Sequence, residues 1–425
     1  MASATLIVES EPVDNERGIV EPEPAGSTDD SERRPLIPDQ QSVKNFLREG
    51  RADLHPHKLT QCMLAVIKIF FVSLGLWDNR WWSCIARIIV SLLCIYQAVY
   101  DMYVVLGCKG FDCGFLQNTT DKNVTHHKDD RKLSNAVYSI ASLGAVLSYG
   151  FIVVCFILAV RRNDSTLVSP ADTMAGNLSN KDALQLCLYF VLIAALYVCS
   201  VVLFYVIIRN QKRGATFDFL ATGVASQFFA QWTAITTCHV FAVSSFALGT
   251  FARDAQRHIH NRNEGTLDDI IEIHEALCTL VFNTVSTYKL WFVFHWLSYG
   301  AVVIPSVIYL STEFHSRHKY GTPILNLVYL CLFFVCHLYL FLVPCIFAAR
   351  ITSRCTGIYD DINIPITSEW NEGHPFRDRS NTALFLSYAK DRQCGFKIGK
   401  IRFNTSLAWL SFFFGLTGLL FHFVQ

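Results

Sequence analysis

Charged residues are scarce in this chain, and their scarcity excludes an ordinary soluble protein. Asp, Glu, Lys and Arg make up 17% of the 425 residues, whereas hydrophobic residues make up 52%, and the mean hydropathy is +0.31. Soluble domains usually carry about 25% charged residues. We therefore predict an all-α membrane protein that crosses the bilayer several times. The formal net charge of +1 says nothing about partners, because the placement of charge matters more than its sum in a membrane protein.

Motifs for nucleotides, metals and catalysis are also missing. The sequence has no P-loop and no glycine-rich nucleotide turn. Two histidine pairs, at positions 55 and 57 and at 258 and 260, lack further ligands at zinc spacing, so solvated polar side chains are the better interpretation. No carboxylate of the kind that proton-coupled carriers need stands out in an apolar segment. We therefore expect no enzyme, no metal, no cofactor and no nucleic-acid partner.

The first 57 residues have no apolar run that would make a secretory signal. They are rich in Glu, Asp, Pro, Ser and Arg, and such segments cannot bury enough surface to offset the entropy of ordering. We predict a disordered cytosolic tail at 1–57. Glu32, Leu36 and Ile37 are arranged as in an acidic dileucine motif, which sorting adaptor complexes read to route proteins to endosomes and lysosomes. A chance match over six residues is an equally good interpretation.

Apolar segments divide the rest of the chain. Residues 58–80 are too short and too interrupted for a span, which predicts an interfacial or re-entrant helix on the cytosolic side, ahead of a membrane domain at 81–425. A mixed helix is expected from Leu384 up to a final uncharged run, which is just long enough to cross a bilayer. We predict seven transmembrane helices, at 81–106, 137–160, 184–208, 219–251, 290–310, 324–349 and 405–425.

Two signals predict a cytosolic N-terminus and an extracellular or lumenal C-terminus. In that orientation, Lys and Arg are more frequent on the inside than on the outside. The first outer loop also holds glycosylation sequons at Asn118 and Asn123, which are useful only on the lumenal side. Cys108 and Cys113 lie in the same loop, where a local disulfide can form.

The connection between the fourth and fifth spans predicts a long helix. Apolar residues recur with helical period from Leu267 to Val285, Thr266 and Asp269 have the spacing of a capping box, and no breaker precedes the fifth span. The helix either lies on the membrane surface or packs against other subunits. Its acidic face disfavours the anionic cytosolic leaflet, so we favour subunit packing.

Three stretches resemble the insect gustatory and odorant receptor superfamily: Gly75-Leu76-Trp77 after the first helix, LDDIIEIHEALCTLV between spans four and five, and CGFKIGKIRFNTSLAWLSFFFG before the last span. The family ends on Thr-Tyr, five apolar residues and Gln-Phe. Here the segment from Thr417 to Gln425 lacks the Tyr and the final Phe. The chain therefore resembles a divergent gustatory-receptor-like protein.

This resemblance implies a ligand-gated cation channel that is a homo- or heterotetramer, with seventh spans lining the pore and cytosolic helix extensions forming the anchor between subunits. Phe421 and Val424 would close the pore by dewetting and Gln425 would offer a polar ring, although lipid-facing packing explains them equally well. A small organic ligand would bind among spans two to six. Topology places the following candidates in the outer halves of these spans, where each alone is more often an interhelical contact: Tyr138, Gln227, Gln231, Trp232, Tyr299, Asn326 and Tyr329.

Two other classes stay open. A G-protein-coupled receptor needs an outer N-terminus and the motifs Asp-Arg-Tyr and Asn-Pro-x-x-Tyr, which the corresponding spans lack. A non-channel scaffold or transporter of the endolysosomal membrane would suit the dileucine-like tail. For a chemosensory channel we expect the plasma membrane instead, with endolysosomal membranes as the alternative.

Overall fold

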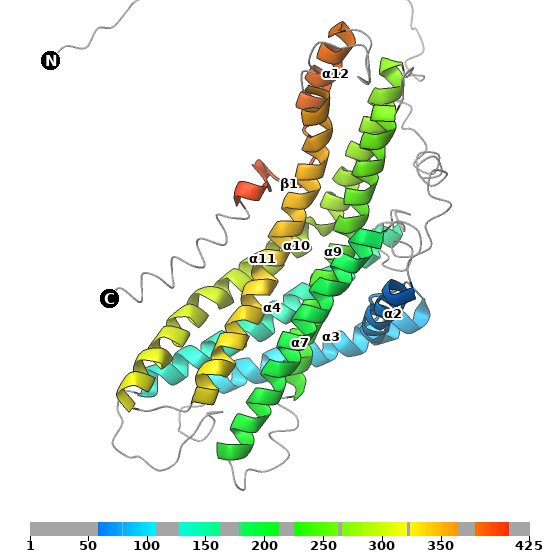
Figure 1. Cartoon of the computed structure of the whole chain (residues 1–425). Helices are drawn as coiled ribbons and strands as arrows, with labels where there is room; N and C mark the ends of the chain where they lie inside the picture. The colour runs from blue at the N-terminus through cyan, green and yellow to red at the C-terminus, as the bar shows by residue number, and fades with distance from the viewer. Residues whose placement is uncertain are drawn as a thin grey trace, which may run out of the picture. The chain divides into compact units, whose positions relative to one another are not determined.

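The computed structural model describes residues 58–78, 80–107, 127–161, 178, 180–211, 225–261, 266–320, 324–363 and 379–407, which lie in one compact unit, Asp39–Gln425. Helices dominate this part of the chain (Figure 1). Their bounds are α2 Lys58–Ser73, α3 Trp81–Gly107, α4 His127–Arg161, α7 Asn180–Gln211, α9 Ala225–Asn261, α10 Leu267–Tyr320, α11 Ile324–Asn363 and α12 Arg379–Arg392, followed by the strands β1 Lys397–Ile398 and β2 Ile401–Arg402.

Among the described residues, 6 helices are long and apolar enough to cross a membrane: α3, α4, α7, α9, α10 and α11. They correspond to the first six predicted spans, although residues 219–224 of the fourth lie outside the described residues. The predicted seventh span lies almost entirely outside the described residues. Apolar side chains such as Ile88 and Leu92 on α3 and Leu188 and Val202 on α7 point outward and are exposed. In water such faces would be a liability, whereas in a bilayer they face lipid.

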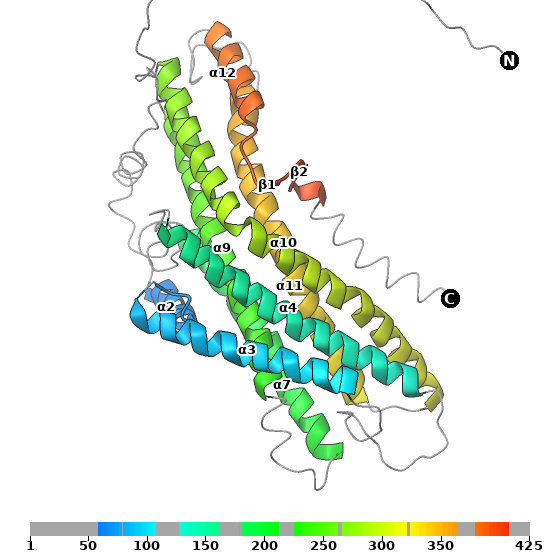
Figure 2. The ribbon, with the colours of Figure 1, turned by 180° about the vertical axis from the view of Figure 1, so that it is seen from behind.

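Helix α9 is the core of the bundle. It contacts α3, α4, α7, α10 and α11, and nearly every residue from Ala230 to Ala252 is buried. Small and hydroxylated residues, including Ala234, Thr237 and Ser244, allow the neighbouring helices to approach closely. Figure 2 shows α3 and α4 side by side and α10 running along α4.

Helix α2 ends on a turn that only glycine fits. Leu76 N–H donates to Phe71 O (2.7 Å) and Gly75 N–H to Val72 O (3.0 Å), the two hydrogen bonds of a Schellman motif. Gly75 has φ +68, and a Cβ there would lie 2.5 Å from Ser83 O. The Arg87 guanidinium then closes the turn by donating to Gly75 O (2.8 Å). This turn places α2 against α7.

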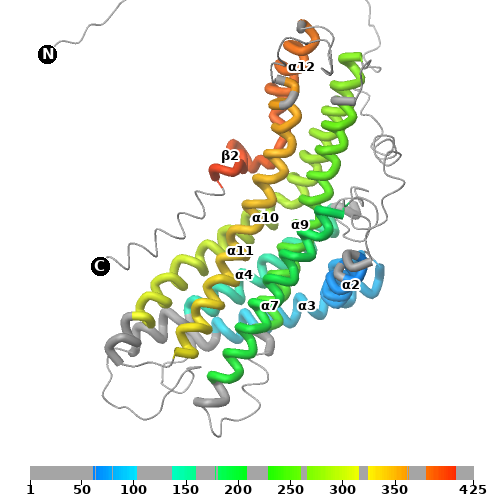
Figure 3. The backbone as a smooth tube through the Cα atoms, viewed as in Figure 1, coloured from blue at the N-terminus to red at the C-terminus, as the bar shows by residue number. Residues whose placement is uncertain are grey.

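Helix α10 is a single helix of 54 residues, as the absence of a breaker predicted, and its path can be followed in Figure 3. The predicted capping box is present: Thr266 N–H donates to Asp269 Oδ2 and Asp269 N–H donates to Thr266 Oγ1, both at 3.3 Å. Hydropathy located only the apolar part of α9 and α11. Both helices continue into polar sequence, to Asn261 and Asn363 respectively.

The expectation of one mixed helix from Leu384 to the final run was wrong. Helix α12 ends at Arg392, and β1 and β2 form an antiparallel hairpin in which Lys397 pairs with Arg402. Backbone conformation explains the break, because Gln393 and Gly395, just after Arg392, adopt φ +47 and +146 and cannot continue a helix. Gly399, with φ +60, lies in the turn of the hairpin. Phe396 and Phe403 flank the hairpin and pack against Phe292 of α10, with ring centroids 4.9 and 4.8 Å apart.

Candidate functional site

Two residues of the predicted ligand pocket meet directly. The hydroxyl of Tyr138 on α4 donates to the hydroxyl of Tyr329 on α11, with 3.1 Å between the oxygens. Both rings pack against Phe333 of α11, with centroids 5.1 and 6.2 Å away. The pair lies 191 residues apart in sequence, so the fold alone brings it together.

A second group of rings surrounds Trp232 on α9. Tyr197 of α7 lies 5.4 Å from it, centroid to centroid. Tyr197 also contacts the ring of Phe228, which contacts Phe204. Phe204 in turn lies 4.9 Å from Tyr329. Predicted residues on α9 and α11 are therefore joined through aromatic rings of α7.

Tyr299 on α10 extends the same set of contacts inward. Its ring lies 6.0 Å from that of His337 on α11, and His337 lies 4.0 Å from Phe333. Tyr299 Oη and His337 Nε2 are buried and have no hydrogen-bond partner among the described residues. Buried polar atoms are nearly always paired in native proteins, so this pair of atoms is where a polar group of a ligand or a water molecule would bind.

We use the name aromatic cluster for the rings that these contacts connect: Tyr138, Tyr197, Phe204, Phe228, Trp232, Tyr299, Tyr329, Phe333 and His337. Topology had pointed to Tyr138, Trp232, Tyr299 and Tyr329, and it missed the others. Gln231 is buried and Asn326 is half-buried near the ends of α9 and α11. Gln227 lies in the first turn of α9, and its side chain is not among those that the structure describes.

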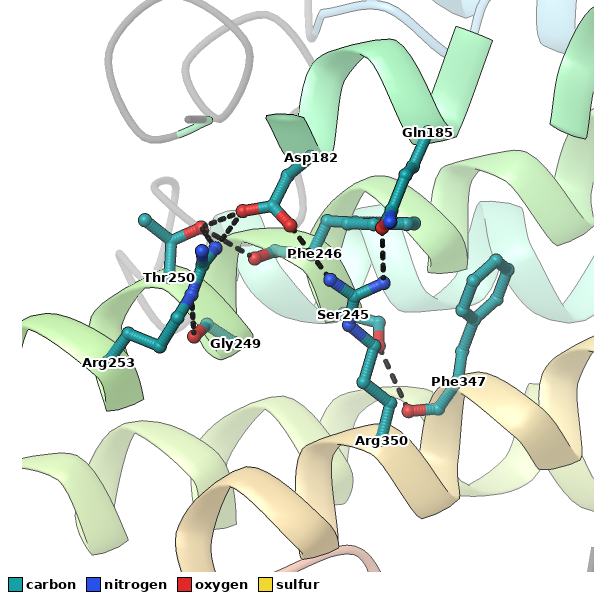
Figure 4. A network of polar contacts seen from close by, with 9 residues as sticks. All are labelled: Asp182, Gln185, Ser245, Phe246, Gly249, Thr250, Arg253, Phe347 and Arg350. Atoms are coloured by element: carbon teal, nitrogen blue, oxygen red, sulfur yellow. Dashed lines mark hydrogen bonds and ion pairs between the residues drawn. The ribbon is translucent and has the colours of Figure 1, made fainter. Parts of the chain in front are cut away.

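A separate polar network ties three helices together near the start of α7 (Figure 4). Asp182, in the first turn of α7, is only 3% exposed and forms ion pairs with Arg253 of α9 and Arg350 of α11. Arg350 Nη2 lies 2.7 Å from Asp182 Oδ1 and its Nη1 donates to Gln185 Oε1 at 3.2 Å. Thr250 Oγ1 donates to Asp182 Oδ2 at 3.0 Å. The N-terminal end of the α7 dipole further favours this carboxylate.

A second carboxylate lies inside a span, which sequence reasoning overlooked. Asp101 on α3 is 8% exposed, accepts a hydrogen bond from Gln97 Nε2 at 2.9 Å, and accepts another from the Ser142 hydroxyl of α4. Both donors are neutral side chains. The sequence-based statement that no such carboxylate stands out was therefore wrong, because a single acid within 27 apolar-rich residues of α3 does not change the hydropathy of the segment.

His295 of α10 lies at the centre of a third network. Its Nε2 is 3.0 Å from Leu340 O of α11, and its Nδ1 is 2.7 Å from the hydroxyl of Ser148 on α4. A carbonyl only accepts, so Nε2 carries the proton and Nδ1 accepts from Ser148. Trp291 Nε1–H donates to Ser148 Oγ at 3.2 Å. Pro344 has no N–H for the carbonyl four residues earlier, and that carbonyl belongs to Leu340.

Several predicted sites lie outside the described residues, and they remain predictions: the pore residues Phe421, Val424 and Gln425, the sequons at Asn118 and Asn123, the cysteines Cys108 and Cys113, and the sorting motif of Glu32, Leu36 and Ile37.

No family model and no curated protein matches the sequence. The fold is similar to the structure of the insect olfactory receptor OR5 from Machilis hrabei, with a TM-score of 0.57 and 11% sequence identity over 85% of this chain and 97% of that chain. The structure of the same receptor in complex with eugenol gives a TM-score of 0.60 and 11% identity over 91% of this chain and 99% of the receptor. This chain therefore has an insect odorant and gustatory receptor-like fold.

Proposed function

We propose that this chain is a chemoreceptor-like channel of the plasma membrane: a tetramer that binds a small organic ligand in the aromatic cluster and opens a cation pore along its seventh spans. One observation carries the proposal. The fold matches the eugenol-bound olfactory receptor over 99% of that chain. A shared fold does not itself fix function, so the site must supply further support.

The aromatic cluster supplies that support through its chemistry. Aromatic walls with a few polar groups suit a small organic molecule, and Tyr299 Oη and His337 Nε2 offer two polar atoms without protein partners among the described residues. His337 Nδ1 lies 2.7 Å from Phe333 O and therefore carries the ring proton, which leaves Nε2 as an acceptor. One hydroxyl group on the ligand would pair with both atoms, by donating to His337 Nε2 and accepting from the Tyr299 hydroxyl. Each such hydrogen bond contributes about 0.5–1.5 kcal/mol.

The long helices support assembly into an oligomer. Helices α9, α10 and α11 have 37, 54 and 40 residues, whereas about 20 suffice to cross a bilayer. The start of α10 carries Asp268 and Glu272 on an exposed face, which an anionic leaflet would repel. We assign this face to packing between subunits, which leaves the seventh spans to surround a central pore with Phe421, Val424 and Gln425 at its outer end.

Patch-clamp recording tests the pore. In cells that express the protein, we expect a cation current that eugenol, the first probe, increases in the wild type. Phe421→Ala and Val424→Ala should make the current constitutive, because removing either apolar ring rewets the closed pore. Leu297→Ala, at an outward-facing position of α10 that is 56% exposed, is the control and should leave the resting current unchanged. Surface-expressed protein without current in any variant would contradict the channel function.

Tyr299→Phe tests the ligand site. The substitution removes a buried hydroxyl that has no protein partner among the described residues, so we expect the protein's stability to be unchanged or slightly higher. The ligand concentration for half-maximal current should rise about two- to tenfold, as the loss of one hydrogen bond predicts. Tyr205→Phe, at an outward-facing position of α7 that is 62% exposed, is the control. An unchanged response in Tyr299→Phe would place the ligand elsewhere.

A transporter is the second candidate, and Asp101 is the observation that favours it. A buried carboxylate between two neutral donors can bind a proton or a cation inside a span. The endolysosomal membrane and the adaptor complexes that read dileucine motifs would fit this function. The same recordings separate the two candidates, because a carrier produces no single-channel steps.

A further inference from the structure

Three thiols from three separate elements meet beside the hairpin. Cys278 lies on α10, Cys355 on α11 and Cys394 in the turn after α12. The Cys394 thiol lies beside those of both Cys278 and Cys355, close enough to interact with each. All three are free thiols; Cys355 and Cys394 are buried, whereas Cys278 is partly exposed. An oxidant can therefore reach Cys278 first, and Cys394 is its neighbour inside the protein.

The turn that carries Cys394 is held on both sides. Gln393 and Gly395 have φ of 47 and 146, and a Cβ on Gly395 would lie 3.1 Å from the methyl group of Thr352. Phe396 N–H donates to Thr352 Oγ1 at 2.9 Å, and the Arg402 guanidinium donates to Cys394 O at 3.0 Å. The backbone contacts on either side of Cys394 thus keep its thiol directed at the other two.

A histidine completes the group. His274 lies one turn before Cys278 on α10, with its Nδ1 3.6 Å from the Cys278 sulfur. The rings of Phe385 and Tyr388 on α12 contact this imidazole, with centroids 5.5 and 5.7 Å away. A neutral imidazole can accept the thiol proton and release the thiolate, which is the reactive form of cysteine.

The Cys394 thiol is protonated at rest. The interaction with Cys278 lowers the pKa of Cys394, but the interaction with Cys355 and burial together raise that pKa well above its ordinary value. The Cys394 thiol is consequently unreactive in a reducing compartment. Oxidation first requires that the partly exposed Cys278 thiol lose its proton.

We propose that Cys278 and Cys394 are a redox-responsive pair that a hydroperoxide converts into a reversible disulfide between α10 and the turn after α12. The Cys278 thiolate, formed when its proton passes to His274, attacks the outer peroxide oxygen; the O–O bond breaks, and an alcohol or water leaves. The sulfenic acid on Cys278 is then attacked by the Cys394 sulfur, which forms the S–S bond and releases water. Two electrons pass from the two sulfurs to the peroxide, and a dithiol reductant reverses the reaction.

The position of the pair suggests what the bond would control. The turn leads through β1 and β2 to Thr405, where the predicted seventh span begins. In the proposed topology this region is cytosolic, a compartment in which stable disulfides are rare and transient ones serve as sensors. A disulfide would hold the entry to that span against α10. This consequence rests on the proposed function, whereas the disulfide chemistry does not.

Mass spectrometry of the full-length protein in detergent tests the pair. After hydrogen peroxide treatment, blocking with a maleimide and digestion, we expect a peptide with Cys278 joined to Cys394 that a dithiol reductant removes. Cys278→Ser and Cys394→Ser should each abolish the peptide, and Cys355→Ser should retain it. His274→Gln should slow its formation about a hundredfold or more, which is the usual range for a lost general base. Wild-type protein that shows no cross-link while folded, or one that joins Cys355 to Cys394, would overturn the proposal.

Current recordings with the same variants test whether the disulfide affects the channel, separately from whether the disulfide forms. On the proposed function, peroxide should reduce the ligand-evoked current of the wild type, and Cys278→Ser should abolish this effect. A confirmed disulfide without any change in current would overturn the link to the seventh span alone. Absence of current in untreated protein would count against the proposed function and would leave the disulfide result intact.

Discussion

Asp182→Asn is expected to lower the free energy of unfolding by about 3 kcal/mol, the lower end of the range for breaking a buried ion pair. The carboxylate is 3% exposed and serves two guanidinium groups, on Arg253 and Arg350, that are 21% and 22% exposed. The amide cannot neutralise them, so two partly buried cations repel each other at the junction of α7, α9 and α11. Thermal unfolding of the purified protein in detergent measures the effect.

Glu275→Gln is the matched control for this prediction. Glu275 pairs with Arg392 at 2.8 Å, yet both side chains are largely exposed, at 40% and 53%. Pairs of this kind contribute about 0–1 kcal/mol, so this variant should unfold close to the wild type. If Asp182→Asn behaved like Glu275→Gln, solvent would be screening the arginines, and the network would not hold the three helices together.

The first six spans were predictable because hydropathy and length are local properties of the chain. The capping box at Thr266 and the unbroken course of α10 were predictable for the same reason, since both depend on neighbouring residues. The Asp182 network was not, because its arginines lie 71 and 168 residues away in sequence. Hydropathy could place Asp182, Arg253 and Arg350 near the ends of apolar segments. It could not show that these parts of α7, α9 and α11 lie side by side.

The candidate site shows the same limit on a smaller scale. Topology placed Tyr138 and Tyr329 in the outer halves of their spans, and the structure joins their hydroxyl groups. Phe333 and His337 of α11 were missed because a span that is apolar on every side gives no periodic signal for the face that points inward. The break after Arg392 was missed as well, although Gly395 was visible in the sequence, because glycine is also tolerated inside membrane helices.

Helix α11 also contains a proline whose consequence appears only in three dimensions. Pro344 leaves the carbonyl of Leu340 without its intrahelical partner, and His295 of α10 donates to that carbonyl at 3.0 Å. The imidazole is fixed from the other side by Ser148 at 2.7 Å. His295 thus replaces the missing backbone amide and joins α11 to α10 and α4 at the point where α11 lacks a hydrogen bond.

A double-mutant cycle tests this role. His295→Leu keeps an apolar volume but removes the donor to the Leu340 carbonyl, whereas the Ser148 hydroxyl keeps Thr237 and Trp291 as partners. We therefore expect a loss of about 2 kcal/mol from one unsatisfied group. Pro344→Ala restores an N–H that can bond Leu340 O within α11, and in that background His295→Leu should cost about 1 kcal/mol less. Pro305→Ala, at the proline of α10, is the control and should leave the cost of His295→Leu unchanged. Equal costs with and without Pro344 would mean that His295 only fills space. If Pro344→Ala lowers the cost of His295→Leu and Pro305→Ala does not, the His295 imidazole is the donor that makes a proline tolerable in the middle of α11.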